Sequence, residues 1–549
     1  MRTFAAIALF ASGVLTIRGD VLRVRSAAAP GGDGSSWLNA IADLQLAINA
    51  ATSGDEIWVA RGVYKPSTNN VRSSSFDLKG GVEIYGGFGG METNRNQRNT
   101  DPRSNGTILS GDIDGNDVNT DGNFLVEDAS EIQGSNSFHV VTITNVAGVV
   151  LDGFTITAGQ ADGTGHHREG GGLRCERFGI RLANLILSGN TAQLGGGLYC
   201  HSGDLILTRS TLTGNSAGAK GGGTWMTSVD GTATQLRLSG NRALGEGGGV
   251  FFDEGDIVFV QVLFVGNSAG TTGGGLHVED EHPLLVQTVF AGNSAGFMGA
   301  AIGGFNTVSL QNSIIWSNRP LLAPDAFPLI ASHCVIEGGA PSGMNIITND
   351  PLFVRLPDPD SNDFGDLRLL LGSPAINAGN NDFIPVDVAD LDGDGQTVEP
   401  LPVDFAGRPR VLNGTVDIGA FEGGFTTFAR LYPSLSPQGD ANGNGFSNIG
   451  EYAFVTDPAA PGNLPNRLRI VQNNNALLLE YTRRANAADL DFVLVRSPNL
   501  VNWTAAEKGV DYETVSSTLS GPNSDALNVV VRIFNDAPQE FWRADINAR

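Results

Sequence analysis

The chain has 549 residues, and 58 acidic against 34 basic side chains give a formal net charge of −24 at neutral pH. This length predicts more than one domain, and the acidic balance argues against binding to nucleic acid or anionic lipid. Three cysteines do not make a disulfide framework.

The N-terminus predicts export. Arg2 precedes an apolar stretch from Phe4 to Ile17, which is too short to span a bilayer comfortably. We interpret residues 1–20 as a secretory signal peptide. No second apolar stretch is long enough for a transmembrane span, so we expect a secreted protein that is extracellular or associated with the outer surface.

Residues 21–65 have the pattern of a cap followed by a first strand. Trp37 to Ala51 is amphipathic, and we expect a helix whose apolar face carries Leu38, Ile41, Leu44, Ala47 and Ile48. Gly54 to Val59 then begins a sheet. Such a helix would cover the open end of the repeats that follow.

One short phrase recurs six times. A large apolar residue stands three places before an asparagine, and the asparagine steps are 25, 26, 26, 26 and 25 residues: Leu187 and Asn190, Leu212 and Asn215, Leu238 and Asn241, Phe264 and Asn267, Phe290 and Asn293, Ile315 and Asn318. Three consecutive glycines follow each of the first four asparagines, and a decayed copy, Gly299-Ala300-Ala301, follows the fifth. A fixed period in this range indicates a solenoid.

The repeat is too short for a strand, a crossover helix and their turns, so we expect coils of short strands stacked as parallel sheets. Asparagine tolerates the left-handed backbone of a sharp bend, and stacked asparagines can bond along the stack. The predicted fold is all-β: a right-handed parallel β-helix at residues 21–349, including the N-terminal cap.

The alternating Phe-x-x-Asn-like and Gly-Gly-Ala-Ile-like motifs resemble the repeats of bacterial polymorphic outer membrane proteins. The second motif is mostly Gly-Gly-Gly-Leu here, and the first has Leu in three copies. The cap and first strand also resemble the start of pectate-lyase-like β-helices. Both resemblances imply a secreted or surface-exposed solenoid.

Alignment of the coils on their glycines assigns the faces of one strand, because side chains alternate across a strand. We expect an outward aromatic row that stacks on sugar rings, formed by Tyr199, Trp225, Phe251 and His277. The next outward row contains the candidate catalytic residues, should the chain be an enzyme: Glu176, His201, Asp253 and Glu279. The alternative is that loops cover the aromatic row.

Cys175 and Cys200 occupy equivalent places in adjacent coils and point inward. The sequence is compatible with a disulfide in an oxidising compartment and with two stacked thiols.

Residues 350–424 carry two specific motifs, Gly372 to Gly379 (GSPAINAG) and Val416 to Glu422 (VDIGAFE). They resemble the choice-of-anchor Q domain found at the end of secreted bacterial β-helices. Between them, Asp390, Asp392 and Asp394 alternate before Gly395, a pattern open to calcium binding or to an Asx turn.

Residues 425–464 read as a linker with a calcium loop. Asp440 to Glu451 matches the twelve-residue loop at every key position, with Gly445 at position 6 and ligands Asp440, Asn442, Asn444, Phe446 (through its carbonyl), Asn448 and Glu451. The pattern resembles dockerin and thrombospondin type 3 loops, so the expected cofactor is calcium.

Residues 465–549 form a separate unit. Leu477–Tyr481, Asp491–Val495, Ala526–Phe534 and Glu540–Ala544 have the pattern of strands, which predicts a small C-terminal β-sandwich.

These features favour a non-enzymatic, adhesin-like or polysaccharide-binding protein, monomeric, whose partner is a polysaccharide or a cell-surface component. A polysaccharide lyase or glycoside hydrolase acting on an acidic polysaccharide is one alternative, and a structural cell-envelope protein is another. The sequence contains no Gly-x-Ser-x-Gly nucleophile elbow, no His-Glu-x-x-His zinc-protease motif and no phosphate-binding loop.

Overall fold

The computed structural model describes residues 19–67, 69–319, 329–340, 342–358, 363–412, 414–424, 441 and 447–454, and then the C-terminal strands β32 to β38 with residues 485, 487, 506 and 508. All but the last two residues of the expected signal peptide lie outside this part of the chain. So do Asp440, Asn442, Asn444 and Phe446 of the calcium loop. Asn448 and Glu451 are described only as backbone, in helix α4 (Asn448–Ala453).

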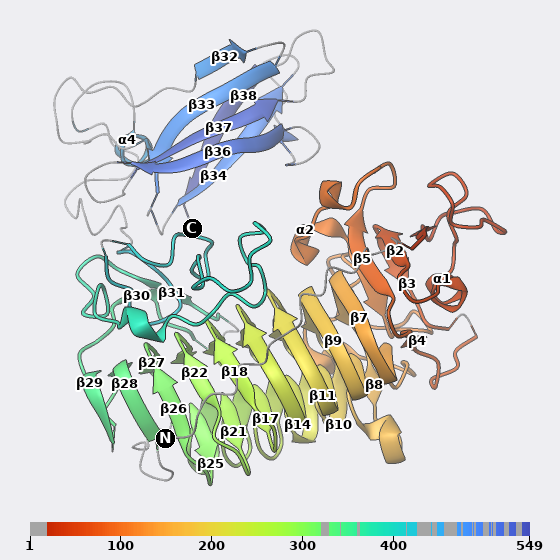
Figure 1. Cartoon of the computed structure of the whole chain (residues 1–549), viewed down its shortest axis with the longest axis horizontal. Helices are drawn as coiled ribbons and strands as arrows, with labels where there is room; N and C mark the ends of the chain where they lie inside the picture. The colour runs from red at the N-terminus through yellow and green to blue at the C-terminus, as the bar shows by residue number, and fades with distance from the viewer. Residues whose placement is uncertain are drawn as a thin grey trace.

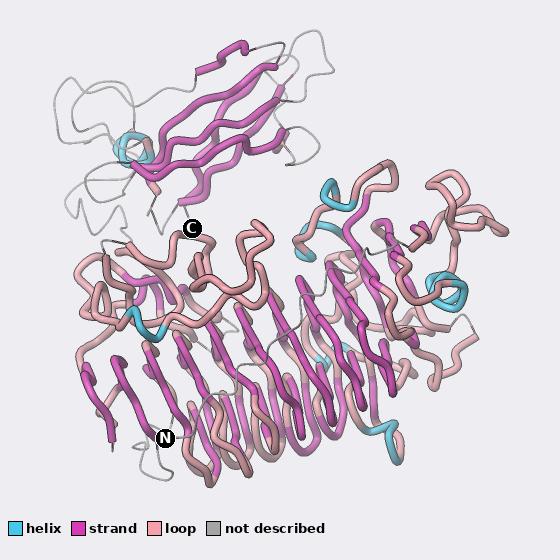
Figure 2. The backbone as a smooth tube through the Cα atoms, in the orientation of Figure 1, coloured by secondary structure: helices cyan, strands magenta, loops and turns pink. Residues whose placement is uncertain are grey.

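The chain forms a right-handed parallel β-helix, as the repeat predicts (Figures 1 and 2). One coil contains four short strands: β17 (Val250–Phe252), β18 (Ile257–Val260), β19 (Leu263–Val265) and β20 (Ser268–Ala269). Each strand pairs in parallel with its counterparts in the neighbouring coils.

The other coils repeat this plan. Longer strands span two or three sides of the early coils: β7 (Val141–Thr157), β9 (Leu173–Ser188), β11 (Leu198–Thr208) and β14 (Thr224–Thr234). Later first strands are β21 (Leu276–Val278) and β25 (Ile302–Gly304), and later second strands are β22 (Leu284–Val286) and β26 (Val308–Gln311). In the last coils, β28 (Leu329–Ile336) and β29 (Ser342–Ile347) each span the second and third sides.

Third strands are β12 (Thr211–Thr213), β15 (Arg237–Ser239), β23 (Val289–Ala291) and β27 (Ile314–Trp316). The short fourth strands are β8 (Gln160–Ala161), β10 (Thr191–Leu194), β13 (Ser216–Lys220), β16 (Arg242–Ala243) and β24 (Ser294–Ala295).

The N-terminal coils are less regular. Their strands are β1 (Val21–Val24), β2 (Glu56–Ala60), β3 (Gly62–Tyr64), β4 (Phe76–Asp77), β5 (Glu83–Phe88) and β6 (Thr107–Ser110). Helix α2 (Pro102–Asn105) and the 3-10 helices η1 (Arg95–Gln97), η2 (Ala129–Glu131) and η3 (Gly165–Arg168) lie in the loops between strands.

The expected cap helix is shorter than the sequence predicts. Helix α1 covers Leu44–Ala50, and the carboxylate of Asp43 caps it by accepting the N–H of Leu46. Leu38 is 93% exposed, so its assignment to a buried helix face is wrong. Ile41 forms a β-bridge with Val24 instead, so the helix cannot include Ile41 and begins only after Asp43.

The repeated asparagine makes a buried ladder inside the turn between the third and fourth strands. In one rung, the Asn241 amide donates to the Leu212 carbonyl at 2.8 Å and to Asn267 Oδ1 at 2.9 Å. Its own oxygen accepts from the backbone N–H and the side-chain amide of Asn215. The predicted hydrogen bonding along the stack is confirmed, but the predicted left-handed backbone is wrong: the residue with positive φ in this turn is the preceding glycine, Gly240 at 62°.

The inward rows form the core, and Cys175 and Cys200 pair in register as buried free thiols. Burial raises the pKa of the Cys175 thiol.

The outward row of third strands changes from polar to apolar along the stack. Arg237 of β15 pairs with Thr211 on one side and Leu263 of β19 on the other. Residues of the segment 350–424 cover the apolar part, packing Phe353, Leu367, Leu369, Ala375, Ile418, Ala420 and Phe421 on Leu263, Val265, Val289, Ala291 and Ile314. This segment, with β30 (Phe353–Arg355), β31 (Asp366–Leu369) and the 3-10 helix η5 (Asn381–Phe383), lies along the side of the last coils (Figure 1).

The two motifs of this segment meet around Arg410, which is 1% exposed. The guanidinium donates to the carbonyls of Asp417 and Gly419 and forms an ion pair with Glu422 at 3.3 Å. Asp417 accepts the backbone N–H of Asn377 at 2.7 Å and so joins the first motif to the second. Burial raises the pKa of Glu422 to about 8, against the attraction of Arg410.

The C-terminal unit is a β-sandwich. One antiparallel sheet has the order β32 (Arg469–Asn473), β33 (Ala476–Arg484), β37 (Ala526–Ile533), β36 (Tyr512–Ser520). The other has β35 (Thr504–Ala505), β34 (Leu490–Ser497) and β38 (Phe541–Ala548). Leu494 of the second sheet packs on Leu479 and Val531 of the first. Among the residues that the structure describes, none of the helices is both long and apolar enough to cross a membrane.

Candidate functional site

The predicted aromatic row exists in register but does not present ring faces to solvent. Tyr199 pairs with Trp225, Trp225 with Phe251, and Phe251 with His277. Tyr199, Phe251 and His277 are 6, 2 and 1% exposed, and Trp225 is half-buried. The prediction of an exposed sugar-stacking row is therefore wrong. The row is covered, but by the neighbouring rings and the Lys220 side chain rather than by the loops that the alternative expected.

The physical reason is that the rings stack on one another and the preceding turn folds over them. Tyr199 and Trp225 stack at 4.5 Å between ring centroids, and Phe251 and His277 at 5.1 Å. The ammonium group of Lys220 lies 4.1 Å from the Phe251 ring centre. The ring faces are thus occupied along the stack, and no sugar ring can replace the neighbouring ring there.

The second outward row is half-buried and tied to its neighbours. Glu176 forms an ion pair with Arg174 at 2.6 Å, which lowers its pKa and keeps it ionised. Asp253 accepts from Thr227, and Glu279 contacts His277 Nε2 at 3.0 Å. His201 pairs with Glu176 and Thr227 in register. None of the four lines the groove described next.

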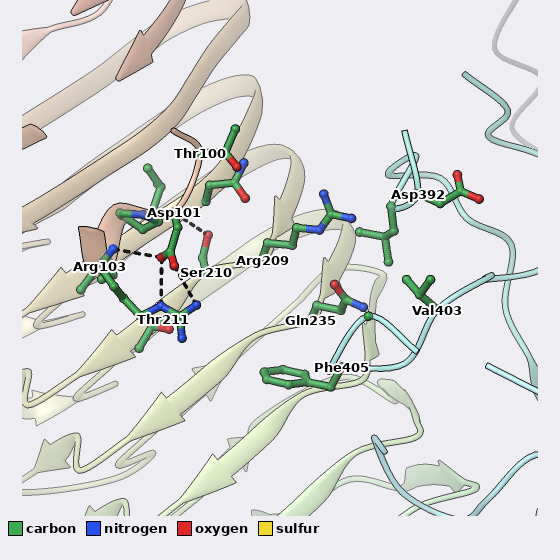
Figure 3. Close-up of a pocket in the computed structure, with 16 residues that line it drawn as sticks. Thr100, Asp101, Arg103, Arg209, Ser210, Thr211, Gln235, Asp392, Val403 and Phe405 are labelled. Carbon is green, nitrogen blue, oxygen red and sulfur yellow. Dashed lines mark hydrogen bonds and ion pairs between the residues drawn. The ribbon is translucent and has the colours of Figure 1, made fainter. Parts of the chain in front are cut away.

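A groove of about 590 Å³ lies instead on another side of the stack (Figure 3). Three segments far apart in the sequence line it. They are the coil corners at Asn184–Ile186, Arg209–Thr211 and Gln235, the turn Thr100–Arg103 at the start of α2, and the loops around Leu391–Asp392 and Val403–Gly407 of the segment that covers the last coils. The groove is the part of the coil surface that lies between these two covering segments.

Its floor is a second ladder, at the corner between the second and third strands. The corner residues are Asn184, Arg209, Gln235, Gln261, Gln287 and Asn312, and all six have a positive φ between 47° and 58°. Gln235 donates to Gln261 Oε1 at 3.0 Å and to the Asp404 carbonyl at 2.9 Å. Gln261 likewise donates to the Val403 carbonyl. The loops of the covering segment therefore bind the amide rungs.

Arg209 breaks this ladder. It is the one rung without an amide among these six, and it holds a left-handed backbone that a long side chain adopts less readily than asparagine. Its guanidinium extends into the groove toward the loop that carries Asp392, and no dashed interaction reaches it (Figure 3). Among the described residues, we find no hydrogen bond or ion pair to this side chain.

The groove walls supply further polar groups and one ring. Asp101 holds Arg103 through two contacts of 2.9 Å, while Asn184 donates to Asp152 at 2.8 Å. Phe405 is half-buried and packs edge-on against Phe421 at 5.5 Å. The groove thus combines planar hydrogen-bonding groups with part of an aromatic face.

An acidic loop borders the groove at Asp392. Carboxylate oxygens of Asp390, Asp392 and Asp394 lie within 4.8 Å of one another. Asp392 belongs to a second group with Asp387 and Glu399, whose carboxylate oxygens also lie within 4.8 Å of one another. The backbone N–H groups of Asp394 and Gln396 donate to the carboxylates two residues before them, Asp392 and Asp394, as in Asx turns. Burial and the surrounding aspartates raise the pKa of Glu399.

The sequence did not reveal the groove, because its walls come from residues that are remote along the chain. One signal was present: the corner residues recur with steps of 25, 26, 26, 26 and 25 residues, and one of them is arginine.

No family model matches the chain, and no curated protein matches it. Among solved structures, the chain is similar to "Crystal structure of pectate lyase Pel9A", with 12% sequence identity and a TM-score of 0.43, over 74% of this chain and 96% of that chain. By its own architecture the protein is a right-handed parallel β-helix with a C-terminal β-sandwich.

Proposed function

We propose that the chain is a non-enzymatic, secreted or cell-surface protein that binds polysaccharide in the groove around Arg209. The observation that carries this proposal is the single arginine in a ladder of amides, whose guanidinium extends into the groove. Amides, guanidinium groups and carboxylates present two polar atoms in one plane, which suits the paired hydroxyls of a sugar. The partly open ring of Phe405 supplies an apolar surface for a sugar face.

The place of action rests on the sequence. The apolar N-terminus supports export. The repeats resemble those of polymorphic outer membrane proteins, and residues 350–424 resemble a choice-of-anchor Q domain, which supports an adhesin-like role at the cell surface. Calcium at Asp440 to Glu451 would stiffen the linker before the C-terminal unit. The start of α4 at Asn448, the ninth loop residue, supports that geometry.

The test compares two arginine variants by co-sedimentation with insoluble or immobilised glycans. Arg209→Gln keeps a ladder-compatible amide, and Arg242→Gln makes the same charge change at an exposed site on β16. Hydrogen bonds to a charged group contribute about 1.5–3 kcal/mol, so we expect Arg209→Gln to weaken binding at least about tenfold. Equal binding by the two variants would refute the assignment of the groove.

A further inference from the structure

A second cluster of ligand atoms lies on a different row of strands from the groove. Glu246 stands in the turn before β17, while His277 is in β21 and Glu279 follows it. We propose that Glu246, His277 and Glu279 bind a divalent transition-metal ion of the Zn²⁺ class. Imidazole with carboxylates is a ligand set that such ions accept.

The repeat shows why this coil differs from the others. His277 occupies the place held by Tyr199, Trp225 and Phe251 in the preceding coils, and those rings carry no ligand nitrogen. Its ring still stacks on Phe251, with only 5° between the planes, so the imidazole is held in a fixed orientation. The covered aromatic row therefore continues at His277 with a ring that carries a nitrogen ligand.

The distances suit one ion. His277 Nε2 and Glu279 Oε2 are 3.0 Å apart, and one carboxylate oxygen of Glu246 lies within 4.8 Å of both. Ligands at about 2.0–2.2 Å from a tetrahedral or octahedral ion lie about 3.0–3.5 Å apart. Only the Glu246 carboxylate has to move inward; its side chain is 29% exposed, and the contact that it must give up is the ion pair with Lys220.

The other ring nitrogen has a partner that suits this role. His277 Nδ1 lies 2.8 Å from Thr272 Oγ1. When Nδ1–H donates to that hydroxyl, Nε2 presents its lone pair toward the two carboxylates, as in many metal-bound histidines. Burial lowers the pKa of His277, which favours the neutral imidazole that a metal requires.

Lys220 competes with the metal ion for the Glu246 carboxylate. Its ammonium group lies 2.9 Å from Glu246 Oε2 and so neutralises the charge that the ion would use. The lysine is exposed enough, at 37%, to move away when an ion binds. Glu279 is 32% exposed, so the positions that three protein ligands leave free would be open to water or to an external ligand.

The experiment is titration of the full chain with ZnCl₂ by calorimetry, in millimolar calcium so that the oxygen-only acidic loops are occupied. His277→Phe restores the ring of the preceding coil and keeps the stack. We expect this variant and Glu279→Gln each to weaken zinc binding at least tenfold, and Lys220→Met to tighten it several-fold. Co²⁺ should give a visible absorption band that His277→Phe abolishes.

A rival site is available in the same protein. The ring centroids of His139, His166 and His167 lie within 6.4 Å of one another. Loss of zinc binding in His166→Ala/His167→Ala, with His277→Phe unchanged, would overturn the proposal. Thermal melting checks the fold of each variant. If His277→Phe fails to fold, the test uses Glu279→Gln and Lys220→Met, because these two side chains are partly exposed to solvent. Unchanged zinc affinity in both variants would also overturn the proposed site.

Discussion

Replacement of one ladder asparagine tests the physical account of the β-helix. Asn241→Ala removes four hydrogen bonds and leaves the buried N–H of Asn215 without that acceptor. An unsatisfied buried donor costs about 1–3 kcal/mol, and each of the other lost bonds contributes about 0.5–1.5 kcal/mol. We therefore expect the free energy of unfolding to fall by about 3–5 kcal/mol, a large part of a typical total of about 5–15 kcal/mol.

Urea unfolding followed by circular dichroism measures this change. Asn96→Ala, at an exposed position in the 3-10 helix η1, serves as the control and should change stability by less than about 0.5 kcal/mol. A loss below about 1 kcal/mol in Asn241→Ala would show that the ladder does not stabilise the stack, and the role given to the repeated asparagine would be refuted.

Three further predictions concern the turns, the covering segment and the linker. A Cβ at Gly222 would lie 2.4 Å from the Gly248 carbonyl oxygen, so Gly222→Ala should cost about 3 kcal/mol or more, measured by the same unfolding experiment. The pKa of Glu422 is higher in the folded chain than in the unfolded chain, so the native state binds a proton that the unfolded state releases. The melting temperature should therefore fall as the pH rises from about 4 to about 8. Glu422→Gln should flatten this slope, and an unchanged slope would show that Glu422 is not the titrating group. Calcium should raise the protease resistance of the linker in the wild type but not in Glu451→Ala, and equal protection of both would exclude the loop as the calcium site.

The sequence predicted what depends on the backbone period. The coil length, the inward rows and the asparagine ladder all follow from residues that recur every 25 or 26 positions, because stacking places equal positions of each coil in register. The outward direction of Trp225 and Phe251 was predicted correctly for the same reason.

Exposure could not be predicted in this way. Whether Phe251 meets solvent depends on the Lys220 side chain and on the rings of adjacent coils. The groove depends on loops around Asp101 and Phe405, which are separated by some 300 residues and meet only in the folded chain. Periodicity identifies the face on which a residue lies, whereas its cover comes from side-chain contacts between coils at Phe251 and from segments outside the repeat at the groove.

The most direct test of the proposed function is incubation of the purified protein with acidic and neutral polysaccharides in the presence of calcium. Co-sedimentation reports binding, while ultraviolet absorbance of unsaturated products and new reducing ends report cleavage. The account predicts retention on at least one polysaccharide without either product, and loss of that retention in Arg209→Gln. Turnover would instead place the chain among the lyases or glycosidases, and the absence of retention on every polysaccharide would favour a structural role and contradict the account.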